Sequence, residues 1–583
     1  MITIRKKEYE ENQMYNKTFD ASRFLGYVNV VSPQKVGIHF PSAALLPRFR
    51  HEGVVLAGGN VGEFVLIEGE RYGFLAKITE LQLPDSERKS LSEKAVHEEN
   101  SIFHPIATAE LLLSFSVIDP TKVERTISRF PEIGAKVYSC SSQVIQVFTA
   151  GIDNQNNRHG DAMPLGSLIA SNVLFAPSLD AIFGRHCAVV GTTGSGKSWT
   201  VAKLLEMLIS STNNKIILLD PTGEYSSFDS ITSKVLSRQI GEDCFFPYEQ
   251  LKVSDLFYLL RPTAQSQRPI LMEAIRSLKT VRIAKSLSSN PLLAQMDGEG
   301  NLKKLGFEKK TLKNFQYLHE QSLDDGYCTF DINRLVKQIK CECVRSFDNV
   351  DKWEAEDART YDFQSSLIFR IQELISTPEF ESLFHFKNKN NEVESITSVI
   401  NSFGDDNQHH LLRIDFSKTS STFNAREIVA NALAKFFYNI SKTGRFKKSP
   451  IVIFLDEAHL FLNKSLIDAD QSLLPLNAFD LIAKECRKFG VFLCLATQMP
   501  RDIPVGTLSQ MGTFIVHRLI NEQDKKVIET ACSSATRSAL AYLPALGAGE
   551  VLFTGVDFPM SVMLKIQAPS IPPDSSTPRL FQK

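Results

Sequence analysis

Long apolar runs are missing from this 583-residue chain. No stretch of about 18 consecutive apolar residues occurs, so a transmembrane helix is not expected. The N-terminal residues MITIRKKEYEENQ contain no apolar segment of the kind that a secretory signal peptide needs. Both absences predict a cytoplasmic protein that makes no use of a membrane.

Cysteine is sparse, with nine residues scattered over the whole chain. Their spacing is not that of a disulfide framework, which fits a reducing compartment. Cys341 and Cys343 form the only close pair in the sequence. A single Cys-x-Cys lacks the further ligands that a zinc site requires, so no structural metal is expected from it.

An excess of positive charge is also missing, because 65 Lys and Arg residues face 66 Asp and Glu residues, for a formal net charge of −1. The chain as a whole therefore lacks the basic character typical of nucleic-acid binding. The clearest local basic cluster is SKTGRFKK at 441–448, which includes Lys442, Arg445, Lys447 and Lys448. A solvated surface is the simpler explanation of this cluster, and a DNA contact in the lining of a ring is the alternative.

The patterns that are present divide the chain into segments. Residues 1–165 hold short runs rich in β-branched and aromatic residues, which predict a small β-barrel. Residues 166–240 and 401–565 alternate buried-strand patterns with helical spacing, which predicts an α/β core. Residues 241–400 have mainly helical spacing and are interpreted as a helical insertion in that core. The Pro- and Ser-rich tail, 566–583, is expected to be extended.

Apolar runs mark the strands that we expect to be buried in this core. Strand, helix and strand follow one another at the spacing of a βαβ unit, so the sheet is expected to be rich in parallel strands. The runs lie at 187–191, 215–220, 411–415, 451–456, 491–497, 513–518 and 550–555.

The first of these runs enters a glycine-rich turn, GTTGSGKS at 191–198, which fits G-x-x-x-x-G-K-[ST] fully. Glycines let backbone N–H groups curl around phosphate oxygens, and the next helix adds the dipole of its N-terminus. Lys197 is expected to reach the β- and γ-phosphates, and Ser198 to hold Mg²⁺. The candidate nucleotide-binding residues here are Gly191, Thr193, Gly194, Ser195, Gly196, Lys197, Ser198 and Trp199.

A second apolar run, Ile451 to Leu455, ends in two acids, Asp456 and Glu457. Asp456 is expected to join the Mg²⁺ shell, and Glu457 to polarise the attacking water. A transferase has less use for a base beside the metal-binding acid, so this pair favours hydrolysis. An ordinary buried strand with an exposed acidic end is the alternative explanation.

Polar and basic residues near other strand ends are further candidates. Gln498 follows the run at 491–497, where parallel sheets place their chemistry, so it is expected beside the γ-phosphate. A polar strand cap is its alternative role. Arg185, Arg487 and Arg518 are candidates for stabilising the charge that develops during phosphoryl transfer, and a surface salt bridge is the alternative for each.

The combination of motifs resembles the HerA family, in the HerA–FtsK branch of P-loop ATPases. The residues that carry the resemblance are RHCAVVGTTGSGKS (185–198), LLDPTGEY (218–225), IFLDEAHLFL (453–462), ECRKFGVFLCLATQMPRDIP (485–504) and FIVHRLINEQD (514–524). LPALGAGEVLFTG (543–555) is similar to the closing strands of the family. The stretch DPTGEY discriminates best, because it is not general to P-loop proteins.

The resemblance implies a RecA-like P-loop domain with a parallel-rich central sheet and a helical insertion, preceded by a small N-terminal β-barrel. It implies ATP and Mg²⁺ as cofactors and a homohexameric ring that moves double-stranded DNA through its pore. Carried over by position, Asp220 and Glu224 match the second-strand motif. Arg487 matches the arginine finger, and Arg185 matches a second arginine at the subunit junction. The tail resembles a segment that braces the neighbouring subunit.

The same resemblance implies a partner. Bacterial HerA-like ATPases are often paired with an effector in anti-phage defence, either a sirtuin-like NAD hydrolase or a nuclease, and the barrel is the natural docking surface. The residue composition is that of a mesophile. Two other functions stay open: an ATP-regulated hexameric scaffold that activates an effector without moving DNA, and a membrane-tethered coupling ATPase, which the lack of a span disfavours.

Overall fold

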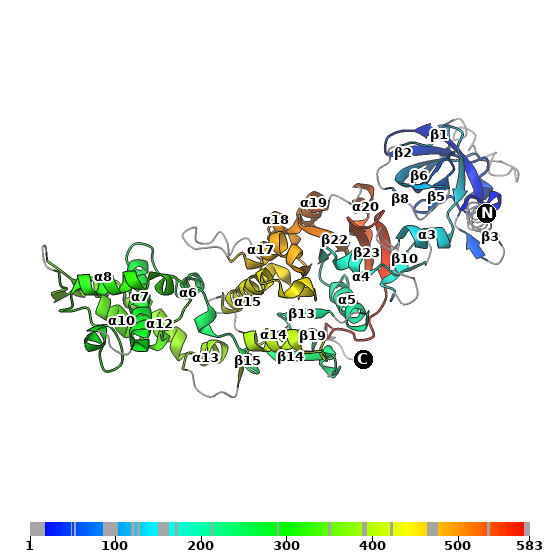
Figure 1. Ribbon diagram of the computed structural model, residues 1–583. Helices are drawn as coiled ribbons and strands as arrows, with labels where there is room; N and C mark the ends of the chain where they lie inside the picture. The colour runs from blue at the N-terminus through cyan, green and yellow to red at the C-terminus, as the bar shows by residue number, and fades with distance from the viewer. Residues whose placement is uncertain are drawn as a thin grey trace, which may run out of the picture. The chain divides into compact units, whose positions relative to one another are not determined.

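Figure 1 shows the computed structural model of the chain. Its residues fall into two compact units, the first made of 1–212, 492–501 and 505–573, and the second of 213–491, 502–504 and 574–583. The structure describes residues 18–47, 49–51, 54–56, 58–85, 103–117, 123–124, 129–149, 163–169, 173–211, 214–231, 233–287, 291–347, 351–387, 393–419, 424–462, 476–532 and 537–575.

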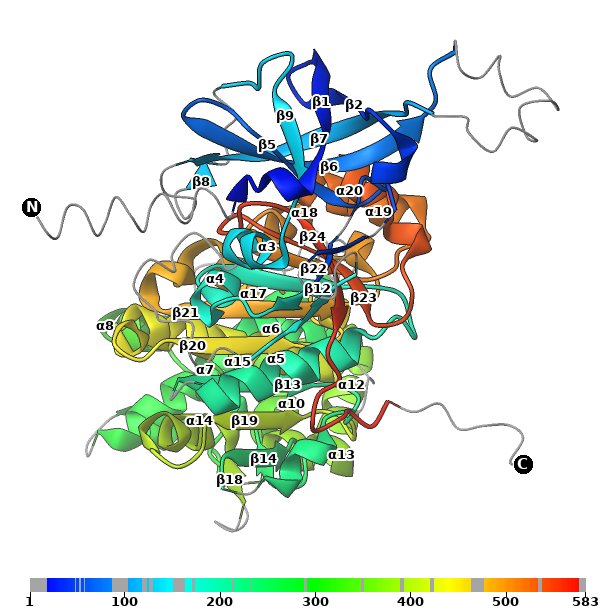
Figure 2. The ribbon, with the colours of Figure 1, turned by 90° about the vertical axis from the view of Figure 1, so that its right-hand side faces the viewer.

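Six antiparallel strands of the first unit close into a barrel (Figure 2). They follow the order β2-β1-β9-β5-β6-β7, and β7 pairs back onto β2. Alternating apolar side chains such as Val36 and Ile38 are fully buried inside it, as the pleat of a strand requires. The predicted barrel is therefore confirmed. Its strands are β1 (Phe24–Val31), β2 (Lys35–His39), β5 (Phe64–Ile67), β6 (Tyr72–Gln82), β7 (Ile106–Ser116) and β9 (Lys136–Ser139).

The first unit also contains a set of core strands in the order β11-β10-β24-β23-β22-β12-β21. The strand β12 (His186–Val190) pairs in parallel with β21 (Val491–Thr497) and β22 (Met511–Val516), and every residue of β12 is buried. The helix α5 (Lys197–Ser211) follows β12. The remaining strands pair antiparallel and are β10 (Gly166–Leu168), β11 (Leu174–Phe175), β23 (Glu550–Gly555) and β24 (Val562–Ile566).

The second unit contains parallel strands in the order β20-β13-β19-β14. All residues of β13 (Lys215–Asp220), β19 (Leu411–Asp415) and β20 (Ile451–Leu455) are buried, as expected for strands covered on both faces. The strand β14 (Val235–Gln239) forms the edge and was not predicted. Its sequence, VLSRQ, is largely half-buried and lacks the continuous apolar run on which the prediction depended.

Helices predominate between 241 and 400, and α6, α7, α10 and α12 lie where helical spacing predicted them (Figure 1). Short two-stranded pairs, β15 with β18 and β16 with β17, were not predicted there. The division into domains at these boundaries stays a prediction. The main helices are α6 (Val253–Leu260), α7 (Gln267–Ser286), α8 (Lys309–Leu318), α10 (Leu335–Glu342), α12 (Ser365–Ser376) and α13 (Pro378–Phe384).

Among the residues that the structure describes, none of the helices combines the length and apolar character needed to cross a membrane. All nine cysteines are free thiols. Cys343 is buried and its Sγ donates a hydrogen bond to the carbonyl of Ile339 at 3.2 Å. No cluster of three or more His, Cys, Asp or Glu side chains able to hold a metal is found in the described ranges.

Candidate nucleotide-binding site

The glycine-rich turn of the first unit has the backbone that only glycine adopts readily. Gly194 and Gly196 have φ values of +72° and +103°, in the left-handed region. A Cβ on Gly191 would lie 2.4 Å from the Cβ of His517, so the strand end and this histidine approach closely. The helix α5 begins at Lys197 directly after the turn, which puts the N–H groups of its first turn at the mouth of the loop.

The predicted binding residues of this turn differ in exposure. Lys197 is 4% exposed and Ser195 is buried, whereas Thr193, Gly194 and Trp199 are exposed. Ser195 fixes the loop from within, because its hydroxyl donates to the carbonyl of Thr192 at 2.6 Å. Gln498 lies at the same turn, where its Oε1 accepts a hydrogen bond from the hydroxyl of Thr193. The structure thus brings Gln498 to the loop, while its expected place beside the γ-phosphate stays a prediction.

His517 is a buried residue of this site that reasoning from the sequence missed. Its Nδ1 lies 3.0 Å from the carbonyl oxygen of Ser195, and its Nε2 lies 2.9 Å from the hydroxyl of Thr200. Burial lowers the pKa of His517 to about 4, against the effect of its backbone hydrogen bond, so the ring is neutral. Since a carbonyl only accepts, Nδ1 carries the proton and Nε2 accepts from Thr200. His517 therefore joins the turn to the first helical turn of α5.

The acid pair of the second unit follows β20 as predicted. Asp456 is 1% exposed, and its backbone N–H donates to the carbonyl of Leu219 at 3.2 Å. Glu457 is also buried and has a φ of +43°, an uncommon conformation for a residue with a side chain. Its Oε2 lies 3.3 Å from Nδ1 of His459. The backbone therefore turns sharply at the position assigned to the general base, the kind of strain that recurs at functional sites.

Tyr225 marks the place where the two acidic motifs of the second unit meet. It is fully buried, and burial first, then the charges of Asp456, Asp220, Glu224 and Glu457, raise its pKa well above the usual value. Four carboxylates from two distant segments are thus close enough to affect one phenol. The structure brings together the acids that the sequence predicted separately.

Asp220 has several partners within its own unit. Its carboxylate accepts from the backbone N–H groups of Gly223 at 2.8 Å and Tyr225 at 3.2 Å, and from Nε of Arg413 at 2.9 Å. Asp220 therefore shapes the turn at 220–225. A direct contact of Asp220 or Glu224 with nucleotide stays a prediction.

Arg413 of β19 is a second residue that sequence reasoning missed. Its guanidinium is 3% exposed and contacts three carboxylates: Asp220, Asp229 at 3.0 Å and Asp415 at 2.7 Å. Burial opposes the charged form, but these three carboxylates raise the pKa of Arg413 above its ordinary value. The pairing with Asp220 spans 193 residues of sequence, so no local pattern signals it.

The three candidate arginines have different surroundings. Arg185 is paired through Nε with Asp557 at 2.9 Å. Arg487 is exposed, and within the described part of the chain its side chain has no ion pair. Arg518 lies beside the glycine-rich turn, because its carbonyl accepts from the backbone N–H of Thr192 at 3.2 Å. Which of them acts on phosphate stays a prediction.

The tail and the basic cluster also have contacts within the chain. In the first unit, Ser570 donates to the carboxylate of Glu206 on α5 at 2.7 Å. In the second, the backbone N–H of Asp574 donates to the carbonyl of Glu224 at 2.7 Å. Residues 576–583, predicted to be part of the brace, lie outside the described residues. In the basic cluster at 441–448, Arg445 pairs with Asp405 at 2.7 Å, and this pairing reduces the positive charge of the cluster.

The chain has a glycine-rich turn between a buried parallel strand and a helix, and it also has an apolar strand that ends in an acid pair. These two features define the P-loop class of nucleoside triphosphatases. Two family models match this chain: "Helicase HerA, central domain" over residues 163–437 and "Helicase HerA-like C-terminal" over residues 423–577. The chain belongs to the HerA family of P-loop ATPases.

Individual relatives are distant. A probable helicase of Methanocaldococcus jannaschii is 26% identical over 397 residues, 67% of this chain and 64% of its own length, so the chain spans less than two thirds of that relative. The DNA double-strand break repair helicase HerA of Saccharolobus solfataricus is 24% identical over 404 residues, 69% of this chain and 68% of its own. Among solved structures, VirB4 of Thermoanaerobacter pseudethanolicus matches with a TM-score of 0.42 and 15% identity, covering 70% of this chain and 97% of that one.

Proposed function

We propose that this chain is an ATP-hydrolysing motor that moves duplex DNA as a homohexamer. The observation that carries the proposal is the glycine-rich turn with its buried lysine, found in a chain that two HerA models match from 163 to 577. The printed names of the relatives, probable helicase and DNA double-strand break repair helicase, support action on DNA.

Each residue of the nucleotide site has a proposed task. Lys197, at the base of the turn, binds the β- and γ-phosphates of ATP. The hydroxyl of Ser198 and the carboxylate of Asp456 are hard oxygen donors of the kind that Mg²⁺ prefers, so this donor set fits the metal. Mg²⁺, when bound, neutralises charge that develops on the phosphates. Glu457 orients the attacking water and receives its proton.

The ring is proposed to complete each site with an arginine from the next subunit. Arg487 is exposed and has no ion pair in the described ranges, so it is available to a neighbouring chain. An arginine delivered in this way stabilises the charge on the transferring phosphoryl group. Gln498, held at Thr193 in this structure, is proposed to report on the γ-phosphate.

We also propose that the barrel docks an effector, a sirtuin-like NAD hydrolase or a nuclease, in anti-phage defence. Exposed apolar side chains support the barrel as a docking surface. Tyr27 and Val30 of β1 are 42% and 57% exposed, and Ile133 is 74% exposed. The turn that carries Ile133 is joined to β1, because Gly134 N–H donates to the carbonyl of Val28 at 2.8 Å. Exposed apolar patches mark interaction sites.

An ATP-regulated scaffold that activates its effector without moving DNA is the second candidate. The net charge of −1 and the pairing of Arg445 with Asp405 favour it, because DNA affinity depends on phosphate neutralisation.

The deciding experiment measures ATP turnover with and without linear duplex DNA, together with displacement of a labelled third strand from a triplex. The motor predicts that duplex DNA stimulates turnover and that the third strand is displaced, and both are lost in Glu457→Gln. The scaffold would be established instead by three results together: duplex DNA leaves ATP turnover unchanged, the third strand is not displaced, and the effector stays active with Glu457→Gln.

A further inference from the structure

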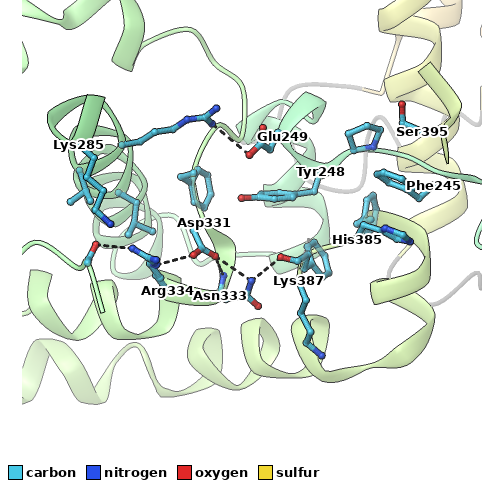
Figure 3. A pocket seen from close by; sticks show the side chains of 18 residues that line it. Phe245, Tyr248, Glu249, Lys285, Asp331, Asn333, Arg334, His385, Lys387 and Ser395 are labelled. Atoms are coloured by element: carbon cyan, nitrogen blue, oxygen red, sulfur yellow. Dashed lines mark hydrogen bonds and ion pairs between the residues drawn. The ribbon is translucent and has the colours of Figure 1, made fainter. Parts of the chain in front are cut away.

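A cavity of about 610 Å³ lies among the helical segments of the second unit (Figure 3). Pockets that bind small molecules have volumes of roughly 300–1,000 Å³, so this one is large enough for a ligand. Its lining includes neither the glycine-rich turn nor the acid pair. The lining residues come from the segments 245–249, 278–285, 330–334 and 384–387, with Gly300 and Ser395.

Part of the wall is aromatic and fixed in position. The ring of Tyr248 meets Phe330 and Phe386 edge-on, with centroids 6.2 and 5.7 Å away. Its hydroxyl accepts a hydrogen bond from the backbone N–H of Ile332 at 3.2 Å, which fixes the ring further. Phe245 and His385 also stack, with centroids 4.0 Å apart (Figure 3). Such a wall offers rigid apolar surface to a flat ligand.

The remaining lining carries more positive than negative charge. Glu249 and Asp331 are the carboxylates, and each is already paired, with Arg282 at 3.6 Å and with Arg334 at 2.8 Å. Two lysines are left, and in the described part of the chain neither of them has an ion pair. The cationic lining residues are Arg282, Lys285, Arg334 and Lys387.

Two of these cations converge at Gly300. A Cβ at this glycine, whose φ is +86°, would lie 2.2 Å from Nη1 of Arg334 and 2.6 Å from Nζ of Lys285. Figure 3 shows both side chains on the same side of the cavity. Asp331 already balances the charge of Arg334. Lys285 beside it therefore supplies the positive charge that attracts a further anion, and the two side chains form an anion-binding corner next to an aromatic wall.

We propose that this cavity binds a nucleoside phosphate, with the phosphate at Lys285 and Arg334 and the base against the aromatic wall. A ligand with one anionic end and one flat apolar end matches both halves of the lining. The ligand is either a free nucleotide or the phosphorylated 5′-terminal nucleotide of a DNA strand, because both present the same chemistry. The site is independent of the proposed motor activity.

The test is calorimetric titration of the full chain with AMP, adenosine and inorganic phosphate. The lining of the cavity does not include Lys197, so we expect AMP binding to persist in Lys197→Ala. Lys285→Ala should weaken AMP by roughly tenfold, as expected for the loss of a charge-assisted contact, and Lys285→Arg should restore it. Lys313→Ala, which removes the charge of an exposed lysine on α8 outside the lining, is the matched control and should bind AMP like the wild type.

A second arm compares a short single-stranded oligonucleotide with and without a 5′-phosphate. If the protein prefers the phosphorylated strand and Lys285→Ala removes that preference, the ligand is the end of a DNA strand. If AMP binds but the protein shows no such preference, the ligand is a free nucleotide. The proposal is overturned if neither AMP nor the phosphorylated strand binds Lys197→Ala protein at millimolar concentration. It is also overturned if Lys285→Ala and Lys313→Ala bind both probes equally.

Discussion

Replacement of Arg413 by methionine tests how the second unit holds its acidic motif in place. The guanidinium is 3% exposed and pairs with Asp220, Asp229 and Asp415. Asp220 is fully buried, so Arg413→Met leaves its carboxylate without a charge partner, at a cost of about 3–5 kcal/mol. The side chain of Asp229 is 41% exposed, and its pairing contributes less than about 1 kcal/mol. Asp229→Asn is therefore the matched weak substitution.

Hydrogen exchange followed by mass spectrometry measures this loss locally, at peptides that contain β13 and β19. A local cost of about 3–5 kcal/mol accelerates exchange there by roughly two orders of magnitude or more. Since the cost comes from a stranded charge, adding Asp220→Asn to Arg413→Met should recover part of the protection. Equal effects of Arg413→Met and Asp229→Asn, or simple additivity of the Asp220 and Arg413 substitutions, would exclude a stranded buried charge as the cause.

Further predictions concern the nucleotide site. His517 has a pKa of about 4 in the folded protein and about 6.5 when unfolded. The neutral ring therefore contributes stability above pH 6.5 that is lost as the pH falls towards 4. The melting temperature of His517→Gln should depend less on pH across this window than that of the wild type, and parallel profiles would contradict the assignment. Gly196→Ala should weaken binding of a fluorescent ATP analogue by roughly tenfold or more, because a φ of +103° strains any side chain and the new Cβ would lie 3.1 Å from the backbone nitrogen of Gly549. The control is Gly62→Ala, at a glycine with a φ of +94° and open space around it, and this variant should bind the analogue normally. Subunits carrying Arg487→Ala and subunits carrying Glu457→Gln should each be inactive alone and partly active when mixed, and no recovery of ATP turnover at any ratio would exclude a role of Arg487 in trans. Chelation of Mg²⁺ by EDTA should stop turnover, and excess Mg²⁺ should restore it; turnover that continues in EDTA would contradict the assignment of Ser198 and Asp456.

The parts of the fold that the sequence predicts best are those in which burial imposes a continuous local pattern. The strands β12, β13, β19 and β20 are buried along their whole length, so each contains a short run that is mainly apolar, although Arg413 interrupts the run of β19. The edge strand β14 is covered less and has polar residues, so its pattern is indistinct. Length acts in the same way: a helix such as α12 is long enough to show a clear helical period, whereas the two-residue strands β15 and β18 are too short to show any period.

The candidate site divides in a similar way. The conformation of the glycine-rich turn depends on residues that are adjacent in the chain, so the turn is recognised from eight consecutive residues. The positive φ values of Gly194 and Gly196 fit that pattern. His517 and Arg413 act through partners 322 and 193 residues away. His517 lies in a stretch, 514–524, that carries the family resemblance, but that stretch does not indicate which residues it contacts. Long-range polar networks are set by tertiary structure, which is why a motif identifies the phosphate cradle but not the residues that hold it in place.

The two arginines assigned to the subunit junction differ in how readily they reach a neighbouring chain. Arg185 is already paired with Asp557, and a Cβ on Gly512 would lie 2.3 Å from its Cδ, so its aliphatic part is held close to the backbone. Both partners are partly exposed, at 34% and 25%, so giving up this ion pair costs less than about 1 kcal/mol. Arg487 gives up no such pair in the described part of the chain. If the proposed ring forms, Arg487 is therefore expected to engage a phosphate in trans before Arg185, which would do so only where phosphate outcompetes Asp557.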